Sequence, residues 1–106
     1  MSSSRKSALW LAALALSASA PWAAADDALL ARSLAATCAN CHGTDGRARG
    51  EMKPLAGLAA DKIVASVADF RSGARPATVM QQIAKGYSDE QLRLIAGHFA
   101  ARPAAQ

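Results

Sequence analysis

The chain has 106 residues, of which 52% are hydrophobic and 5% aromatic, and its formal net charge is +4 at neutral pH. This length is typical of one domain, and so small a charge argues against a nucleic-acid-binding protein, which concentrates basic residues on one face. Much of the apolar content is alanine, which buries little surface, so a domain of this size needs a further stabilising element.

The N-terminus has the layout of a secretory signal peptide. Positive charges at residues 5–6 precede an unbroken apolar run at 8–16, and the small residues 23–25 suit signal-peptidase cleavage. The alternative is an uncleaved membrane anchor, but the apolar run is shorter than the about 20 residues that span a bilayer. We therefore predict a signal peptide at 1–25 and one exported, periplasmic domain at 26–106, with no membrane span in the mature chain.

The mature chain is expected to begin with a helix. Asp26 or Asp27 suits its N-terminus, where acidic side chains are favourable, and Gly43 is a plausible end. A glycine-rich and proline-containing loop at 44–58 follows. The apolar stripe of this helix is predicted to be Leu30, Leu34, Cys38 and Cys41.

Three further helices are predicted, and no stretch alternates with the period of two that is typical of strands. The second helix spans about 60–71, and the third runs from Pro76, which suits a first helical turn, to about Ala84. Ser88 and Gln91 match a capping box at the start of the last helix. The fold class is therefore all-α. The predicted inward-facing residues are Ile63, Val64, Val67 and Phe70, then Val79, Met80 and Ile83, then Leu92, Ile95, Ala96 and Phe99.

Both cysteines of the chain and one of its two histidines lie in the sequence Cys38-Ala39-Asn40-Cys41-His42. A thioredoxin-like dithiol would stand at the start of a helix after a strand, whereas this motif ends a helical pattern. A tetrahedral zinc site needs four ligands, and His98 is the one histidine or cysteine left. The third interpretation is covalent haem attachment, for which Cys-x-x-Cys-His is the signature, and it accounts for the motif best.

The spacing of this motif has a physical reason. Residues three and four apart lie on the same helix face, so Cys38, Cys41 and His42 can present two sulfurs and an imidazole to one side. The sulfurs would add to the vinyl groups of one haem, giving one covalent haem c per chain, and His42 would ligate the iron. A large apolar cofactor also supplies the missing core, because binding that requires the folded site adds to folding stability.

The mature chain resembles a class I c-type cytochrome over essentially its whole length. Residues 75–80 (RPATVM) and 83–91 (IAKGYSDEQ) further resemble the small cytochrome subunit of flavocytochrome c sulfide dehydrogenase and the halves of c4-type dihaem cytochromes. This resemblance implies a small class I cytochrome c fold, with about four helices packed around one covalent haem.

The resemblance also implies a methionine as the second axial ligand. Met80 stands in the matching stretch, far enough from His42 for the chain to cross to the opposite haem face, whereas Met52 follows the motif closely. His98 lies off the apolar stripe of its helix and is predicted to be a surface residue. The resemblance further implies that a proline carbonyl, here that of Pro54, holds the second ring nitrogen of His42.

Two sets of polar residues are weaker candidates. Arg75 and Tyr87 are hypothesised to satisfy the haem propionates, because buried carboxylates need donors or cations. A basic rim would steer an acidic partner. Its members would be Arg47, Arg49, Lys53, Arg75 and Lys85.

With both axial positions filled, the iron has no open site for a substrate, so we expect an electron-transfer protein rather than an enzyme. It would transfer single electrons through a His/Met-ligated haem, as a soluble carrier or as the electron-accepting subunit of a flavocytochrome c sulfide dehydrogenase. Its partners would be redox proteins, such as the flavoprotein subunit of a sulfide dehydrogenase. The alternative is a haem-based sensor or peroxidase-like protein with a labile sixth ligand, which rapid binding of carbon monoxide to the reduced protein would indicate.

Overall fold

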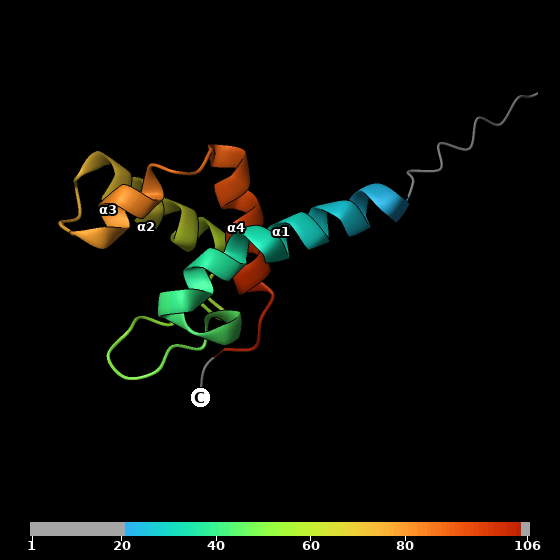
Figure 1. Cartoon of the computed structure of the whole chain (residues 1–106), viewed down its shortest axis with the longest axis horizontal. Helices are drawn as coiled ribbons and strands as arrows, with labels where there is room; N and C mark the ends of the chain where they lie inside the picture. Colours follow the sequence, from blue (N-terminus) through green and yellow to red (C-terminus); the bar gives the residue numbers. More distant parts are fainter. Residues whose placement is uncertain (1–20, 105–106) are drawn as a thin grey trace, which may run out of the picture.

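The computed structural model describes residues 21–104 and is helical, with no strand in that range. The helices are α1 (Pro21–His42), α2 (Ala60–Ser72), α3 (Val79–Ala84) and α4 (Asp89–Ala100), and a short 3-10 helix, η1 (Thr44–Gly46), follows α1. The predicted all-α class with four helices is confirmed. In Figure 1 the N-terminal turns of α1 project away from the other helices, and α4 crosses its middle.

Helix α1 begins at Pro21, so the predicted start at Asp26 or Asp27 is wrong. The alanines at 23–25 have the highest helix propensity of any residue, so the helix continues upstream through the predicted cleavage point. The rest of the predicted signal peptide, residues 1–20, lies outside the described residues. Among the described helices, none has the length and apolar character needed to cross a membrane.

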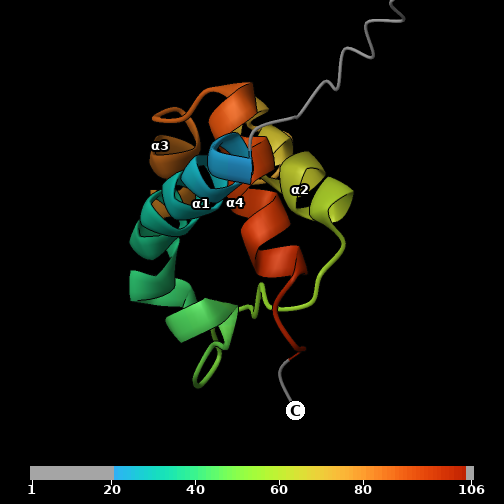
Figure 2. The ribbon, with the colours of Figure 1, turned by 90° about the vertical axis from the view of Figure 1, so that its right-hand side faces the viewer.

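The centre of the fold is the contact of α4 with α1 on one side and α2 on the other (Figure 2). The predicted stripe of α4 is confirmed, since all four of its residues are buried. Ile63 of α2 completes this core together with Ala35 of α1. The buried residues of α4 are Leu92, Ile95, Ala96 and Phe99.

The inner face of α1 differs from the prediction. Its buried residues are Ala31 and Ala35, one turn apart, whereas Leu30 is 47% exposed and Cys41 is exposed. Alanine lets two helix backbones approach closely, so the contact with α4 selects the small residues rather than the leucine beside them. Leu34 packs against the core only partly covered, as does Cys38.

Helix α3 is shorter than predicted. It begins at Val79 and not at Pro76, and its N-cap residue Thr78 makes no side-chain capping bond. The preceding residues are instead fixed against α2, because Gly73 is left-handed and the Arg75 N–H donates to the Asp69 carbonyl at 3.1 Å. Val79, predicted to face inward, is 59% exposed.

The capping box at the start of α4 is confirmed. The Gln91 N–H donates to Ser88 Oγ at 3.1 Å, and the Ser88 N–H donates to Gln91 Oε1 at 2.9 Å. These reciprocal bonds satisfy two of the N–H groups that a helix start leaves without partners. They fix the point at which the chain turns from α3 into α4.

Candidate functional site

The three residues of the predicted haem motif form the last turns of α1. The helix stops at His42 because Gly43 adopts φ +84°, and its N–H donates to the Ala39 carbonyl at 2.9 Å. A Cβ at Gly43 would lie 2.1 Å from the Arg47 carbonyl oxygen. Only glycine therefore allows the chain to turn back directly after the histidine.

His42 is held by the backbone of the loop that follows. Its Nδ1 lies 2.6 Å from the Lys53 carbonyl oxygen and donates to it, so in the neutral tautomer that this bond selects Nε2 carries the lone pair. A ligating histidine is usually oriented in this way, through a partner on its other nitrogen. The imidazole is thus set up to offer Nε2 to a metal.

The structure corrects the predicted partner of this histidine. The carbonyl belongs to Lys53, one residue before Pro54. A residue that precedes a proline is restricted to extended backbone conformations, so Pro54 acts by constraining the Lys53 peptide and not by accepting the bond itself. The loop is also tied to η1, because the N–H groups of Leu55 and Ala56 both donate to the Gly46 carbonyl, at 2.9 and 3.1 Å.

The two cysteines are free thiols, with Cys38 half-buried and Cys41 exposed. Burial raises the pKa of the Cys38 thiol above its ordinary value, so before any covalent attachment it is a neutral thiol at neutral pH. Thioether formation would remove this titration. Two unpaired thiols and an imidazole with a free Nε2, all at the end of one helix, fit the donor set that covalent haem requires.

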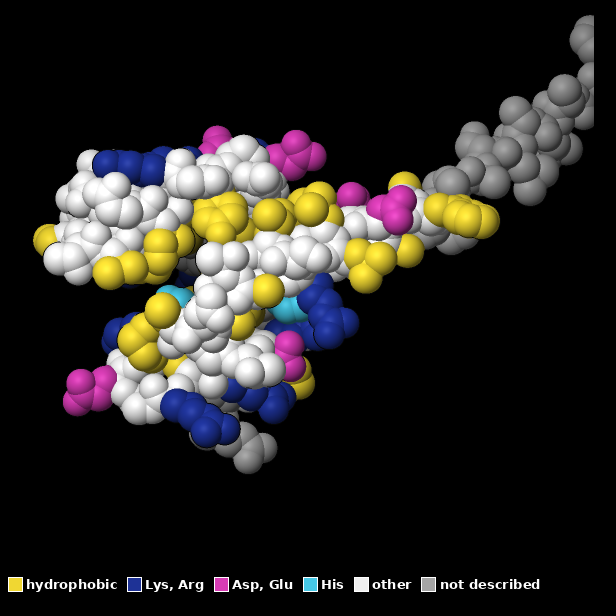
Figure 3. All heavy atoms as spheres, viewed as in Figure 1, with side chains coloured by type: hydrophobic (Ala, Val, Ile, Leu, Met, Phe, Trp, Pro, Cys, Tyr) yellow, Lys and Arg dark blue, Asp and Glu magenta, His cyan; other side chains and the backbone are white. Residues whose placement is uncertain are grey.

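The surface beside this motif is hollowed. Figure 3 shows a recess between the part of the molecule that holds α2 and α3 and the part formed by the end of α1 and the following loop. Apolar side chains that pack on the core remain partly uncovered, and no polar or charged side chain is buried among the described residues. These properties suit a large apolar cofactor. The uncovered side chains include Leu34, Leu55, Val64, Val67 and Tyr87.

The three candidates for the second axial ligand come from different elements. Met80 is half-buried in α3, and in the shared view of Figures 1 and 3 α3 lies on one side of the recess and the His42 end of α1 on the other. Met52 is an exposed residue of the loop. His98 is half-buried, with its ring edge-on to Phe99 at 5.4 Å, and burial followed by the positive charge of Arg102 lowers its pKa.

The structure brings two residues of the predicted basic rim together. Arg47 and Arg49 line a surface pocket of about 480 Å³ together with Cys41. Arg75 instead lies with its guanidinium 5.1 Å from the centre of the Phe70 ring. The proposed contacts of Arg75 and Tyr87 with haem propionates stay predictions.

Sequence reasoning missed Arg71, whose guanidinium bonds three acceptors around the turn from α3 to α4. A basic residue in the last turn of a helix is expected from the helix dipole alone. The sequence therefore contained no sign that this arginine would contact residues well beyond its own helix.

No family model matches. The chain is 41% identical over 66 residues to the cytochrome subunit of sulfide dehydrogenase from Chlorobaculum tepidum. This match covers 62% of this chain and 60% of that protein. It is 34% identical over 82 residues to cytochrome c-554(548) from Halomonas halodenitrificans. This second match covers 74% of this chain and 99% of that protein.

A solved structure of cytochrome c4 from Acidithiobacillus ferrooxidans is similar in fold. The TM-score is 0.61 at 28% identity, and the match covers 68% of this chain and 49% of that one. The chain thus spans about half of this structure and 60% of the sulfide dehydrogenase subunit. The predicted resemblance to these two groups is confirmed.

Proposed function

The chain belongs to the c-type cytochromes, and on this premise we propose that it is a periplasmic electron acceptor for a sulfide-oxidising flavoprotein, with its iron between His42 and Met80. It carries one covalent haem c through Cys38 and Cys41, transfers electrons between redox partners, and is not itself an enzyme. The axial pair, the periplasmic location and the flavoprotein are the parts proposed here.

The observation that supports His42 as an iron ligand is the bond from its Nδ1 to the Lys53 carbonyl at 2.6 Å. It leaves Nε2 as the nitrogen available to iron. Met80 would approach from α3, on the other side of the recess in Figure 3. When bound, the haem supplies a one-electron couple whose potential methionine ligation raises. The residues of this chain orient the imidazole, offer the thioether and surround the site with apolar side chains.

The periplasmic location is supported by the charge, apolar run and small residues of the first 25 positions. Export with cleavage would leave Asp26 as the first residue of the haem-containing protein. We expect intact-mass measurement of the protein, purified from cells that attach haem c, to give residues 26–106 plus one haem. A mass that retains residues 1–25 would instead indicate an uncleaved anchor.

The flavoprotein partner is supported by the similarity to the sulfide dehydrogenase cytochrome subunit. The arginines beside Cys41 suggest how such a partner would dock. Arg47 and Arg49 are exposed around the surface pocket that they line with Cys41, so an acidic surface would be attracted to them. Electrostatic steering of this kind accelerates association and weakens with salt.

The experiment is sulfide-dependent reduction of the haem-loaded chain by the flavoprotein subunit of a sulfide dehydrogenase from the same cells, followed by absorbance. We expect Arg47→Glu with Arg49→Glu to slow the bimolecular rate at low salt by about tenfold or more, within the range of steering effects. A matched control, Lys62→Glu with Arg93→Glu, changes the same charge at exposed positions on α2 and α4. Absence of sulfide-dependent reduction would contradict the proposed partner, and equal slowing in both pairs would contradict the proposed docking surface.

A further inference from the structure

We propose that Arg71 is a positioning residue for Met80: by holding the turn between α3 and α4, its guanidinium keeps α3 in place and the methionine sulfur on the iron. This role rests on the proposed ligation by Met80. Arg71 lies in α2 and acts through the segment that contains the ligand.

Few interactions within helix α3 stabilise it. It has six residues, no side-chain cap at Thr78, and one buried residue, Ala84. Isolated helices shorter than about 12 residues are marginal in water. Helix α3 packs on α2, while α4 packs on both α1 and α2. Its position therefore depends on what ties it to α2.

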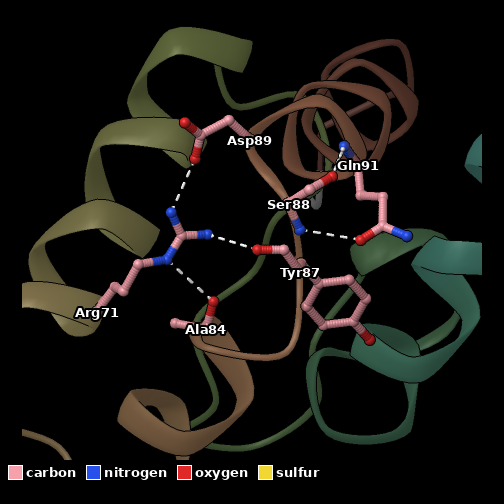
Figure 4. Close-up of polar contacts among 6 residues, drawn as sticks. All are labelled: Arg71, Ala84, Tyr87, Ser88, Asp89 and Gln91. Atoms are coloured by element: carbon pink, nitrogen blue, oxygen red, sulfur yellow. Dashed lines mark hydrogen bonds and ion pairs between the residues drawn. The ribbon is translucent and has the colours of Figure 1, made fainter.

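Arg71 supplies such a tie through three bonds, drawn in Figure 4. Nε donates to the Ala84 carbonyl at 3.2 Å, one terminal nitrogen donates to the Tyr87 carbonyl at 2.8 Å, and the other pairs with Asp89 Oδ1 at 2.8 Å. The acceptors belong to the end of α3, the connecting turn and the first turn of α4. Ala84 is the last residue of α3, and helix ends leave such carbonyls without a partner in the helix.

The two carbonyl bonds matter more than the ion pair. The Asp89 side chain is 75% exposed and that of Arg71 is 32% exposed. Exposed ion pairs contribute little because water and salt screen them. The carbonyl bonds are part-buried, and only a planar guanidinium with its five donors reaches both carbonyls and the carboxylate at once.

A second arginine holds the other end of the same segment. The Arg75 N–H donates to the Asp69 carbonyl at 3.1 Å, and its guanidinium lies 5.1 Å from the centre of the Phe70 ring, within cation–π range. The chain between Arg75 and Tyr87 is thus attached to α2 at both ends, with Met80 between the attachments. Loss of either attachment lets this segment move while the contact between α1 and α4 stays intact.

The test compares haem-loaded Arg71→Gln with wild type and with Lys62→Gln, which removes the same charge from an exposed position of the same helix. Two properties are measured on the ferric protein. The first is its affinity for imidazole, which competes with the methionine for the iron. The second is the temperature at which the near-infrared sulfur-to-iron band disappears, compared with the temperature at which the helices melt by far-ultraviolet circular dichroism. When a competing state is more populated, the apparent affinity of its ligand rises in proportion.

We expect Arg71→Gln to bind imidazole about tenfold more tightly and to lose the band well below the temperature at which its helices melt. Asp89→Asn, which retains the two carbonyl bonds, should shift imidazole affinity less than about threefold, and Lys62→Gln should leave it unchanged. Arg71→Lys keeps the charge without the planar fork and should act like Arg71→Gln, which provides a second variant if the first fails to fold.

Two results would overturn the role of Arg71 alone. In one, imidazole affinity is unchanged and the band and the helices melt together at a lower temperature, as for a merely structural residue. In the other, Asp89→Asn reproduces the whole effect. A near-infrared band that survives Met80→Ala would overturn the proposed ligation itself and the role of Arg71 with it, so the two failures are distinguishable.

Discussion

Replacement of Met80 by alanine is expected to abolish the near-infrared sulfur-to-iron charge-transfer band of the oxidised protein completely. Alanine has no sulfur, and α3 contains no other methionine, cysteine or histidine. The reduction potential should fall, because a thioether ligand raises it. The reduced variant should also bind carbon monoxide, since the sixth position is open. Absorbance spectroscopy and a redox titration measure these effects.

Met52→Ala is the matched control, because Met52 is an exposed residue of the loop after the motif. It should keep the band and a potential close to that of the wild type. Loss of the band in Met52→Ala with retention in Met80→Ala would move the ligand to the loop. Rapid binding of carbon monoxide by the reduced wild type would instead favour a sensor or peroxidase-like protein with a labile sixth ligand.

Replacement of Phe99 by alanine is expected to destabilise the protein by about 3–5 kcal/mol, the usual effect of removing a large buried aromatic side chain. Phe99 is fully buried, with 0% of its surface exposed. A Cβ at Gly46 would lie 2.8 Å from Phe99 Cδ1, so the ring packs directly under η1. The Gly57 N–H donates to the Phe99 carbonyl at 3.0 Å. One residue thus supports both the helical core and the loop that holds His42.

Denaturant unfolding of the haem-loaded protein, followed by circular dichroism, measures this loss. The control is Leu29→Ala, which also truncates a large apolar side chain but at a position that is 63% exposed. Exposed substitutions usually change stability by less than about 0.5 kcal/mol. Similar losses in the two variants would show that Phe99 does not have the central role described above.

The features predicted well from the sequence are those that neighbouring residues decide. The capping box at Ser88 and the stripe of α4 follow from spacings within one helix, and both are present. The haem motif was recognisable for the same reason, since its three functional residues lie within five positions. Each of these patterns lies within a few consecutive residues and does not depend on contacts between helices.

The features predicted poorly depend on contacts between elements. The face that α1 presents was decided by how closely α4 approaches, which favoured Ala31 and Ala35 over Leu30. The start of α3 was decided by bonds from Arg75 to α2. The partner of His42 shifted by one residue, because a carbonyl direction depends on the whole loop. No local pattern encodes these distances.

Lys53 orients His42 through its main-chain oxygen, so its side chain is free to serve another role. The carbonyl of this residue accepts the bond from the imidazole, while its side chain is exposed to solvent. A change of side chain at position 53 leaves the carbonyl in place, provided that Pro54 still constrains the peptide. The charge at this exposed position can therefore vary in evolution without disturbing the orientation of the imidazole.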